Sequence, residues 1–594
     1  NEVKLEETWN LKDLFETETA LFEAVDTLSE TILKFNEIYQ SKITNSDTAI
    51  KALDEVADIQ EKLTRVFTYT SLLNSEDQSN PNSMRLAGDI NVKLGDKLLL
   101  LHCLSQEFSL LSKETLEEIK EKDPKYTKVV DDVIRNIPHL LDPKVEDALS
   151  VLNPSLNAAY NIYNMAKLVD MTFDSVKKDD QEIEMSFGYF EDELAFHSDK
   201  EIRHQAFDKF HKSLKAHENT FASVYTSHVL KEKSMATLKN FNNTIEYLLF
   251  DQEISQSIYD NHIDTIMTEL APHMRKFAKL LQKIHGLDTM TTNDLHLVVD
   301  ESFDPNISIE ESKNHLLDGL KVLGEDYTDM IHKAFDERWI DFPQNKGKST
   351  GAFCSSPYGV HPYVLISWTK KMREVFVLAH ELGHAGHFYL AGQNQSIHNT
   401  RPSLYLIESP STMNELLMAN HLKQTSDDPR FKRWVLSTLI SRTYYHNFVT
   451  HFIEAHFQRE VYRKIDNNEA LSAHVLNDLF QKSLEMFWGD GVEISENTNL
   501  TWMRQPHYYM GLYPYTYSAG LSIATVSSQN ILNNKLDIET WKNYLKLGGS
   551  LSPVELTKTL GIDLNSDSAL KETIQIIGDM IDEIIDLTDE IENQ

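Results

Sequence analysis

Two histidines and a glutamate in EVFVLAHELGHAGHFYLA, residues 374–391, have the types and the spacing of a metal centre. His380 and His384 lie four positions apart, so on an α-helix they share one face, about 40° apart in rotation, and both imidazoles reach one ion. Glu381 points about 100° away from His380, so it misses the ion but reaches a water molecule bound to it. The alternative is a pair of hydrogen-bonded histidines in an ordinary core helix. A third ligand elsewhere in the chain would decide between the two.

The histidine segment offers no third ligand of its own. His387 lies on the same face of the helix but about 10 Å along the axis from His380, which is too far to share one ion. The extended metzincin pattern would place Gly at 387 and His at 390, whereas this chain has His387 and Leu390. We therefore expect His387 to pack behind the ligands or to support them.

A better candidate lies in LIESPSTMNE, residues 406–415. Glu408 stands at the start of a helical pattern, and a carboxylate on a second, antiparallel helix can meet the two imidazoles. Glu415, seven residues later, shares its face and can orient a ligand histidine through the free N–H group of the ring. The alternatives are an exposed carboxylate at a helix N-terminus for Glu408 and a surface acid for Glu415.

Two imidazoles and one carboxylate leave the fourth position of a zinc ion open for water. Zinc lowers the pKa of that water from about 15.7 to about 7, so hydroxide is available at neutral pH. Glu381 would take the proton and pass it to a leaving amine, while zinc polarises the carbonyl group. The pattern thus predicts hydrolysis of an amide bond. Zinc, rather than manganese or cobalt, is inferred from the ligand types.

Hydrogen-bond donors for a developing oxyanion are plentiful in RQPHYYMGLYPYTYSAGLSIATV, residues 504–526. This stretch carries one histidine and five tyrosines within eleven positions: His507, Tyr508, Tyr509, Tyr513, Tyr515 and Tyr517. Pro514 suits the first position of a helix, which places Tyr513 in the preceding loop and Tyr517 on the first turn. A tyrosine stays protonated at pH 7 and can donate to the oxyanion. The alternative is an aromatic packing cluster, and we expect at least half of these residues to be that.

The elements that must position these residues are mostly helices. Apolar residues recur at three- and four-residue spacing near 20–40, 48–73, 82–110 and 113–136, which predicts a helical scaffold. Around 165–190, alternation in LVDMTFDSV and EIEMSF on either side of KKDDQ predicts a small β-hairpin. Helical patterns then return from EIRHQAFDKF, which begins at residue 201, through to about 284, again at 308–335, and again beyond 410. We expect an N-terminal lobe over residues 1–195 and a catalytic domain over 196–594.

A short strand is predicted directly before the histidine helix, at YVLISW, residues 363–368. In that position a strand would offer an open edge to an extended peptide and would bind its backbone whatever the side chains. An ordinary internal strand is an equally good interpretation.

The charge and the composition exclude several classes of function. A net charge of −35 argues against a nucleic-acid surface, which needs clustered basic residues to neutralise phosphates. The two cysteines, Cys103 and Cys354, lack CxxC spacing, which excludes a disulfide framework and a thiolate metal site and favours a reducing cytosol. No apolar run approaches the roughly 18 residues of a membrane span, and the start, NEVKLEETWNLKDLF, is too charged for a secretory signal.

Together these motifs resemble the oligoendopeptidase F branch of the thimet-oligopeptidase-like zinc metallopeptidases. The resemblance is carried by HELGHAGH, IESPSTMNE and H-x5-Y-P-Y-T-Y, and it extends to WNLKDLF, GKSTGAFCSSPYGVHPYVLISW and GGSLSPVEL. It therefore spans nearly the whole chain. One stretch, TLKNFNNTIEYLL at 237–249, departs from the ARGYES-like sequence common among relatives.

The resemblance implies a mainly α fold, an α-rich ellipsoid of two lobes with a small β-sheet beside the active-site helix and a deep internal substrate channel. It implies one zinc ion per chain, held by His380, His384 and Glu408. By the same resemblance, the general base of the family corresponds to Glu381. Its transition-state-stabilising residues correspond to His507, Tyr513 and Tyr517, with Tyr515 as the alternative to Tyr517.

The sequence therefore predicts a cytosolic zinc endopeptidase that cleaves internal bonds of short oligopeptides. Oligopeptides are its expected partners; nucleic acid and membranes are not, and no oligomeric state is predicted. One alternative is an exopeptidase of the dipeptidyl-carboxypeptidase type within the same family. Another is a catalytically silent peptide-binding or scaffold protein.

Overall fold

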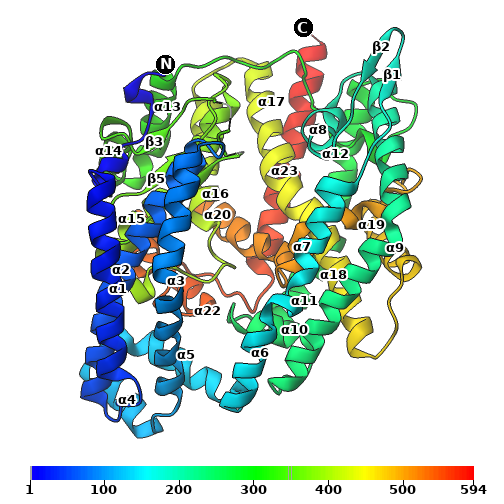
Figure 1. The fold of residues 1–594 in the computed structure, drawn as a ribbon. Helices are drawn as coiled ribbons and strands as arrows, with labels where there is room; N and C mark the ends of the chain where they lie inside the picture. Colours follow the sequence, from blue (N-terminus) through cyan, green and yellow to red (C-terminus); the bar gives the residue numbers. More distant parts are fainter. Residues whose placement is uncertain (1–2, 346, 350, 594) are drawn as a thin grey trace.

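The chain folds mainly into α-helices, as the sequence predicts. The computed structural model describes residues 3–345, 347–349 and 351–593. Figure 1 shows the N-terminal helices on one side, α9 (Lys200–Leu238) and α19 (Ala473–Trp488) on the other, and α16 (Ser409–Gln424) and α20 (Tyr517–Leu532) between them. The described strands form two small sheets. Among the described residues we find no helical stretch with the length and apolarity that a bilayer span requires.

The N-terminal side consists of helices that lie close to the predicted ranges. They are α1 (Glu18–Tyr39), α2 (Ser46–Glu76), α3 (Pro81–Ser109), α4 (Lys113–Lys122) and α5 (Thr127–Asn136). Thr17, Asn45 and Ser112 define where α1, α2 and α4 begin, because each side chain accepts a hydrogen bond from a backbone N–H group of the first turn. The apolar faces of these helices meet in one hydrophobic core.

The middle of the chain crosses to the opposite side of the molecule in Figure 1. Its helices are α6 (Pro143–Leu156), α7 (Ala158–Met165), α8 (Phe187–Asp192), α9, α10 (Thr244–Phe250), α11 (Gln256–Thr265) and α12 (Ala271–Ile284). The predicted hairpin is confirmed, with β1 (Val176–Lys178) antiparallel to β2 (Gln181–Ile183). It is shorter than predicted, because Ala166–Asp170 forms a π-helical turn after α7. The division at residue 195 stays a prediction, since the second hydrophobic core already includes Tyr163.

A three-stranded sheet lies beside the histidine helix. Its order is β3 (Ile340–Asp341), β5 (Tyr363–Leu365), β4 (Phe353–Ser355), with β3 parallel and β4 antiparallel to β5. The predicted strand is therefore internal, and the interpretation of residues 363–368 as an open edge is wrong, because hydrogen bonds to β3 and β4 occupy both of its sides. Trp9 covers this sheet edge-on to Tyr363, with ring centroids 6.2 Å apart.

The rest of the chain is helical, as predicted for 308–335 and for the region beyond 410. The remaining elements are α13 (Ile309–Leu320), α14 (Glu325–Asp336), α15 (Arg373–Asn394), α17 (Pro429–Thr438), the π-helix η11 (Leu439–Thr450), α18 (His451–Asp466), α21 (Ile538–Leu547), α22 (Pro553–Lys558) and α23 (Ser568–Glu592). The acidic helix α23 packs on the body of the protein through buried isoleucines such as Ile577 and Ile581.

Two glycines allow helices α15, α16 and α20 to meet closely. A Cβ atom on Gly383 of α15 would lie 2.4 Å from the carbonyl oxygen of Pro410, and one on Gly520 of α20 would lie 3.0 Å from the backbone nitrogen of Ser409. Any larger residue would push the helices apart. The start of α16 is thus held against both neighbours.

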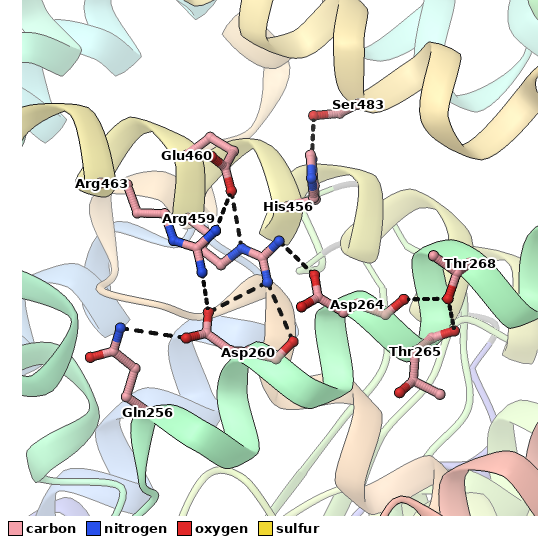
Figure 2. A network of polar contacts seen from close by, with 10 residues as sticks. All are labelled: Gln256, Asp260, Asp264, Thr265, Thr268, His456, Arg459, Glu460, Arg463 and Ser483. Carbon is pink, nitrogen blue, oxygen red and sulfur yellow. Dashed lines mark hydrogen bonds and ion pairs between the residues drawn. The ribbon is translucent and has the colours of Figure 1, made fainter.

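An ion network fixes α18 against α11 (Figure 2). The guanidinium of Arg459 on α18 lies 2.7 Å from a carboxylate oxygen of Asp264 on α11, and it also donates to the backbone oxygen of Asp260 at 3.3 Å. Arg463, one turn later, donates to the Asp260 carboxylate at 2.9 Å. Arg459 is 3% exposed, whereas the side chain of Asp264 is 58% exposed, so only the guanidinium of this pair is shielded from water. This network fixes the helix whose first turn borders the site described next.

Candidate active site

Helices α15 and α16 bring the three predicted metal ligands together. Nε2 of His380 lies 3.3 Å from Oε2 of Glu408, and Nε2 of His384 lies 3.4 Å from the same oxygen. The three ligand atoms all lie within 4.8 Å of one another. The spacing that places both imidazoles on one face of α15 is thereby confirmed.

Two of the three ligand separations match those around a tetrahedral zinc ion. Zinc binds nitrogen and oxygen ligands at about 2.0–2.1 Å, and the edge of such a tetrahedron is about 3.3 Å long. The two distances of 3.3 and 3.4 Å to the Glu408 oxygen match that edge. Two imidazoles and one carboxylate also form one of the ligand sets of catalytic zinc sites. The residues present therefore fit a zinc ion.

Glu415 orients His380 through the other nitrogen of the ring. Nδ1 of His380 donates to Oε1 of Glu415 at 2.5 Å, and the hydroxyl of Thr443 donates to Oε2 at 2.6 Å. Burial alone would lower the pKa of His380, but the carboxylates of Glu408 and Glu415 raise it well above its usual value. With Nδ1 engaged in this way, Nε2 is directed at the ligand cluster.

Glu408 precedes the first turn of α16 and is held by its own helix. The hydroxyl of Ser411 donates to Oε2 of Glu408 at 2.8 Å and to its backbone oxygen at 2.9 Å. Burial raises the pKa of Glu408, but the imidazoles of His384 and His380 overcome this and hold it well below its usual range. The carboxylate is therefore ionised, as a metal ligand must be.

Glu381 lies beside the ligands and does not join them. It is 6% exposed and borders the same cavity as His380 and Glu408. Burial raises the pKa of Glu381 above its ordinary value, against the lowering effect of the two imidazoles. A carboxylate with a raised pKa is a stronger proton acceptor near neutral pH.

His387 is a packing residue, as the helical geometry predicts. It is 2% exposed, and its ring stacks on Phe388 with centroids 5.2 Å apart. Burial lowers the pKa of His387 to about 3, so its ring is neutral.

The loop before α20 gathers three of the predicted aromatic residues. The ring of His507 lies 4.7 Å from that of Tyr513 and 6.2 Å from that of Tyr517. Tyr517, the first residue of α20, borders the same cavity as His380 and Glu381. Burial and then the nearby charge of Glu408 raise the pKa of Tyr513, so both tyrosines remain protonated donors at neutral pH.

The other tyrosines of this stretch pack in the core. Tyr515 is fully buried, and its hydroxyl donates to Gln252 at 2.5 Å. Tyr508 is 1% exposed and lies against Phe457, with ring centroids 5.3 Å apart. Tyr509 lies 4.7 Å from the ring of Tyr163. Half of the aromatic cluster is thus structural, as expected.

A cavity of about 370 Å³ opens over the ligands. It is lined by Ala352, Phe376, Val377, His380, Glu381, Glu408, Glu415, Thr438, Arg442, Thr443, His446, Asn447 and Tyr517. The long channel implied by the resemblance stays a prediction.

Sequence reasoning missed the polar side chains that the π-helix η11 contributes to this cavity. Arg442, Thr443, His446 and Asn447 all line it. The wider turn of a π-helix is frequently found at functional sites. The signal in the sequence, RTYYHN, has no spacing that marks it as part of a site.

Sequence reasoning also missed a chain of titratable groups next to Tyr517, of which His451 and Glu454 are buried. The His451 ring stacks on Tyr517 with centroids 4.3 Å apart and an angle of 8° between the planes. Its Nδ1 lies 2.9 Å from Oε2 of Glu454, and its Nε2 lies 3.1 Å from Nε2 of His446. Burial raises the pKa of Glu454 to about 7. The i, i+3 spacing of His451 and Glu454 was the available sequence signal.

Two family models match the chain. The model described as Peptidase family M3 matches residues 194–576, and the model described as Oligopeptidase F matches residues 107–173. Among curated proteins, Oligopeptidase PepF of Bacillus subtilis is 28% identical over 99% of this chain and 88% of the relative. An Oligoendopeptidase F homolog of Borreliella burgdorferi is 26% identical over 98% of both chains.

Solved structures share the fold over nearly the full length. A crystal structure from Chlamydophila abortus aligns with a TM-score of 0.89 at 21% identity over 99% of both chains. Oligoendopeptidase-F from Enterococcus faecium aligns with a TM-score of 0.73 at 21% identity, over 96% of this chain and 98% of the other. Because the M3 model matches more than half of its residues, this chain belongs to peptidase family M3, in the oligoendopeptidase F branch of these metallo-oligopeptidases.

Proposed function

We propose that this protein is a zinc endopeptidase that hydrolyses internal bonds of short oligopeptides. The observation that carries the proposal is the convergence of His380, His384 and Glu408 at tetrahedral spacing, with Glu381 beside them in one cavity. The membership of a peptidase family supports peptides as substrates.

A zinc ion held by the three ligands would supply an acidified water molecule and polarise the scissile carbonyl group. Glu381 is placed to accept the proton of that water, because it borders the cavity and its pKa is raised by burial. The same carboxyl group then gives the proton to the amine of the leaving peptide.

Donors for the oxyanion come from the loop before α20. Tyr517 borders the cavity, and the rings of Tyr513 and His507 lie 5.7 Å and 6.2 Å from its ring between centroids. Burial keeps both phenols protonated, so each can donate an O–H group to a developing negative charge. We assign transition-state stabilisation to these three residues.

We expect the outer side of strand β4 to bind the backbone of the peptide. Within the described sheet β4 pairs with β5 alone, so its other side is not occupied by a strand. Ala352, directly before β4, lines the cavity over the ligands. An extended peptide that pairs with β4 would be held by main-chain hydrogen bonds irrespective of its side chains.

The variant Glu381→Gln tests the chemistry. A quenched fluorescent peptide blocked at both ends should be cut internally by the wild type, and the variant should be slower by about 10²–10⁴-fold. Zinc content should stay near one ion per chain in both proteins. Glu374→Gln, which alters a buried glutamate of the same helix outside the cavity lining, is the matched control. Retained turnover in Glu381→Gln would refute the proposed base.

The masses of the products separate the two enzymatic interpretations. An endopeptidase cleaves the doubly blocked peptide, whereas an exopeptidase that removes dipeptides from a free end does not. A purified protein without zinc and without turnover would favour the scaffold interpretation. The cytosol remains the proposed location, supported by the small number of cysteines.

A further inference from the structure

The cavity over the metal ligands contains one strong cation. Its charged lining residues are the carboxylates of Glu381, Glu408 and Glu415 and the guanidinium of Arg442. Two of these carboxylates are already committed, Glu408 to the imidazole pair and Glu415 to His380 and Thr443. The positive charge of Arg442 is the part of the lining that the proposed chemistry does not use.

Arg442 has no ion-pair partner among the described residues. No carboxylate in that part of the chain comes within 4.0 Å of its guanidinium, although the charges of Glu415 and Glu374 act on it from further away. Glu374 instead accepts a hydrogen bond from Thr369 at 2.7 Å. A guanidinium remains charged in proteins, so one that lines the cavity without an ion-pair partner offers its N–H donors to an anion that enters there.

The side chain of Arg442 is exposed in the cavity. His446 is exposed as well, and both residues line the cavity, so a bound molecule can contact both side chains. Asn447, five residues after Arg442 on the π-helix η11, lines the cavity as well and offers an amide donor. Five residues is the hydrogen-bond period of a π-helix, so Arg442 and Asn447 share one face.

We propose that Arg442, assisted by Asn447, binds a carboxylate of the peptide substrate and thereby selects which bond lies over the metal ligands. This carboxylate is either the C-terminal group of the peptide or the side chain of an Asp or Glu residue. The planar fork of a guanidinium binds both in the same bidentate way. The inference rests on the proposed peptidase function and adds a substrate preference to it.

The net charge of the protein affects how acidic peptides approach this cation. At a net charge of −35, the surface as a whole repels acidic peptides. A single guanidinium in the cavity restores attraction at the one place where the substrate carboxylate has to arrive. The competing explanation is that Arg442 only balances Glu415 and Glu374, and the experiment below separates the two.

The experiment measures binding of peptides to the zinc-loaded Glu381→Gln protein, which should bind without turning over. The peptides all have an acetylated N-terminus and are of three kinds: a neutral C-terminal amide, the free C-terminal acid of the same sequence, and amides in which Glu replaces each position in turn. We expect either the free acid or the amide with Glu at one position to bind about 10- to 100-fold more tightly than the neutral amide. This is the effect of a hydrogen bond to a charged group.

Substitution of the cation should remove that preference. Adding Arg442→Gln should bring the charged peptide to the affinity of the neutral amide and leave the neutral amide itself unchanged. Arg442→Lys should keep part of the preference, because it retains the charge but not the fork. Lys432→Gln, which removes one positive charge from the neighbouring helix α17 outside the cavity, should leave the preference intact.

Each outcome has a defined meaning. Preference for the free acid identifies the C-terminal carboxylate, and preference at one Glu position identifies an acidic side chain. Equal loss of affinity for charged and neutral peptides in Arg442→Gln would overturn the proposal in favour of the balancing role. Absence of any charge preference, while the wild type still cleaves the neutral amide, would overturn this inference alone. If the wild type cleaves no peptide, the proposed function and this inference both fall.

Discussion

Nδ1 of His380 and Oε1 of Glu415 are joined by a hydrogen bond of 2.5 Å, so one nitrogen of the imidazole is fixed by a carboxylate seven residues after the metal-binding carboxylate Glu408. The other oxygen of Glu415 accepts a hydrogen bond from Thr443 on the π-helix. The ligand histidine is therefore held by two helices besides its own, α16 and η11. Its orientation depends on that support as much as on the helix that carries it.

Removing the support should weaken metal binding without removing a ligand. We expect Glu415→Ala to lower the affinity for zinc about 10- to 100-fold, measured by competition with a chelator of known affinity. Thr443→Val leaves the carboxylate in place and should have a smaller effect in the same direction. An unchanged zinc affinity in Glu415→Ala would show that the His380 ring is fixed by packing alone.

Substitutions of Tyr515 and Tyr517 should cause different defects. We expect Tyr517→Phe to lower kcat about 10²–10³-fold with little change in KM or zinc content, because a donor to the oxyanion acts in the transition state. Tyr515→Phe is the matched control, since Tyr515 is fully buried and donates to Gln252. It should lower stability and leave kcat close to that of the wild type. The opposite pattern would transfer the catalytic role to Tyr515.

The metal centre could be predicted from the sequence because its ligands follow a helical period. His380 and His384 share a face through spacing alone, and their helix was marked by apolar flanks. Glu408 is predictable because it stands at the start of a later helical pattern. Its position against the histidines depends on Gly383 and Gly520, whose close contacts with α16 are visible only in three dimensions.

The rest of the cavity could not be predicted, for a physical reason. Arg442 and His446 line it from Leu439–Thr450, and nothing in that segment of the sequence indicates which of its faces meets the metal ligands. The internal position of β5 likewise depends on β3 and β4, which pair with it from other parts of the chain. Neither the helix type nor the neighbours of a strand are local properties of a sequence.

The buried carboxyl of Glu454 should make stability depend on pH. Burial raises its pKa from 4.5 to about 7, so the folded protein binds this proton more tightly than the unfolded chain. Its stabilising contribution is complete below pH 4.5 and is lost as the pH rises through 7. The shift corresponds to about 3 kcal/mol in the free energy of unfolding. Urea unfolding at pH 5, 6, 7 and 8 should show Glu454→Gln gaining stability relative to the wild type as the pH rises. A constant difference between the two proteins would contradict the buried, protonated state.

Glycine at position 383 should be required for the contact between α15 and α16, and through it for the metal centre. A Cβ atom there would lie 2.4 Å from the carbonyl oxygen of Pro410 and 2.5 Å from the Cα of Ser411, so the helices must separate. We expect Gly383→Ala to lower the free energy of unfolding by about 1–3 kcal/mol, the usual cost of overpacking. Zinc affinity should fall too, because Glu408 moves with α16.

Gly392→Ala is the control on the same helix, since its Cβ atom would meet nothing within 4 Å. It should raise stability by up to about 1 kcal/mol through helix propensity. If both variants gain stability and bind zinc normally, the helices do not depend on their close approach, and the ligand geometry must be set elsewhere.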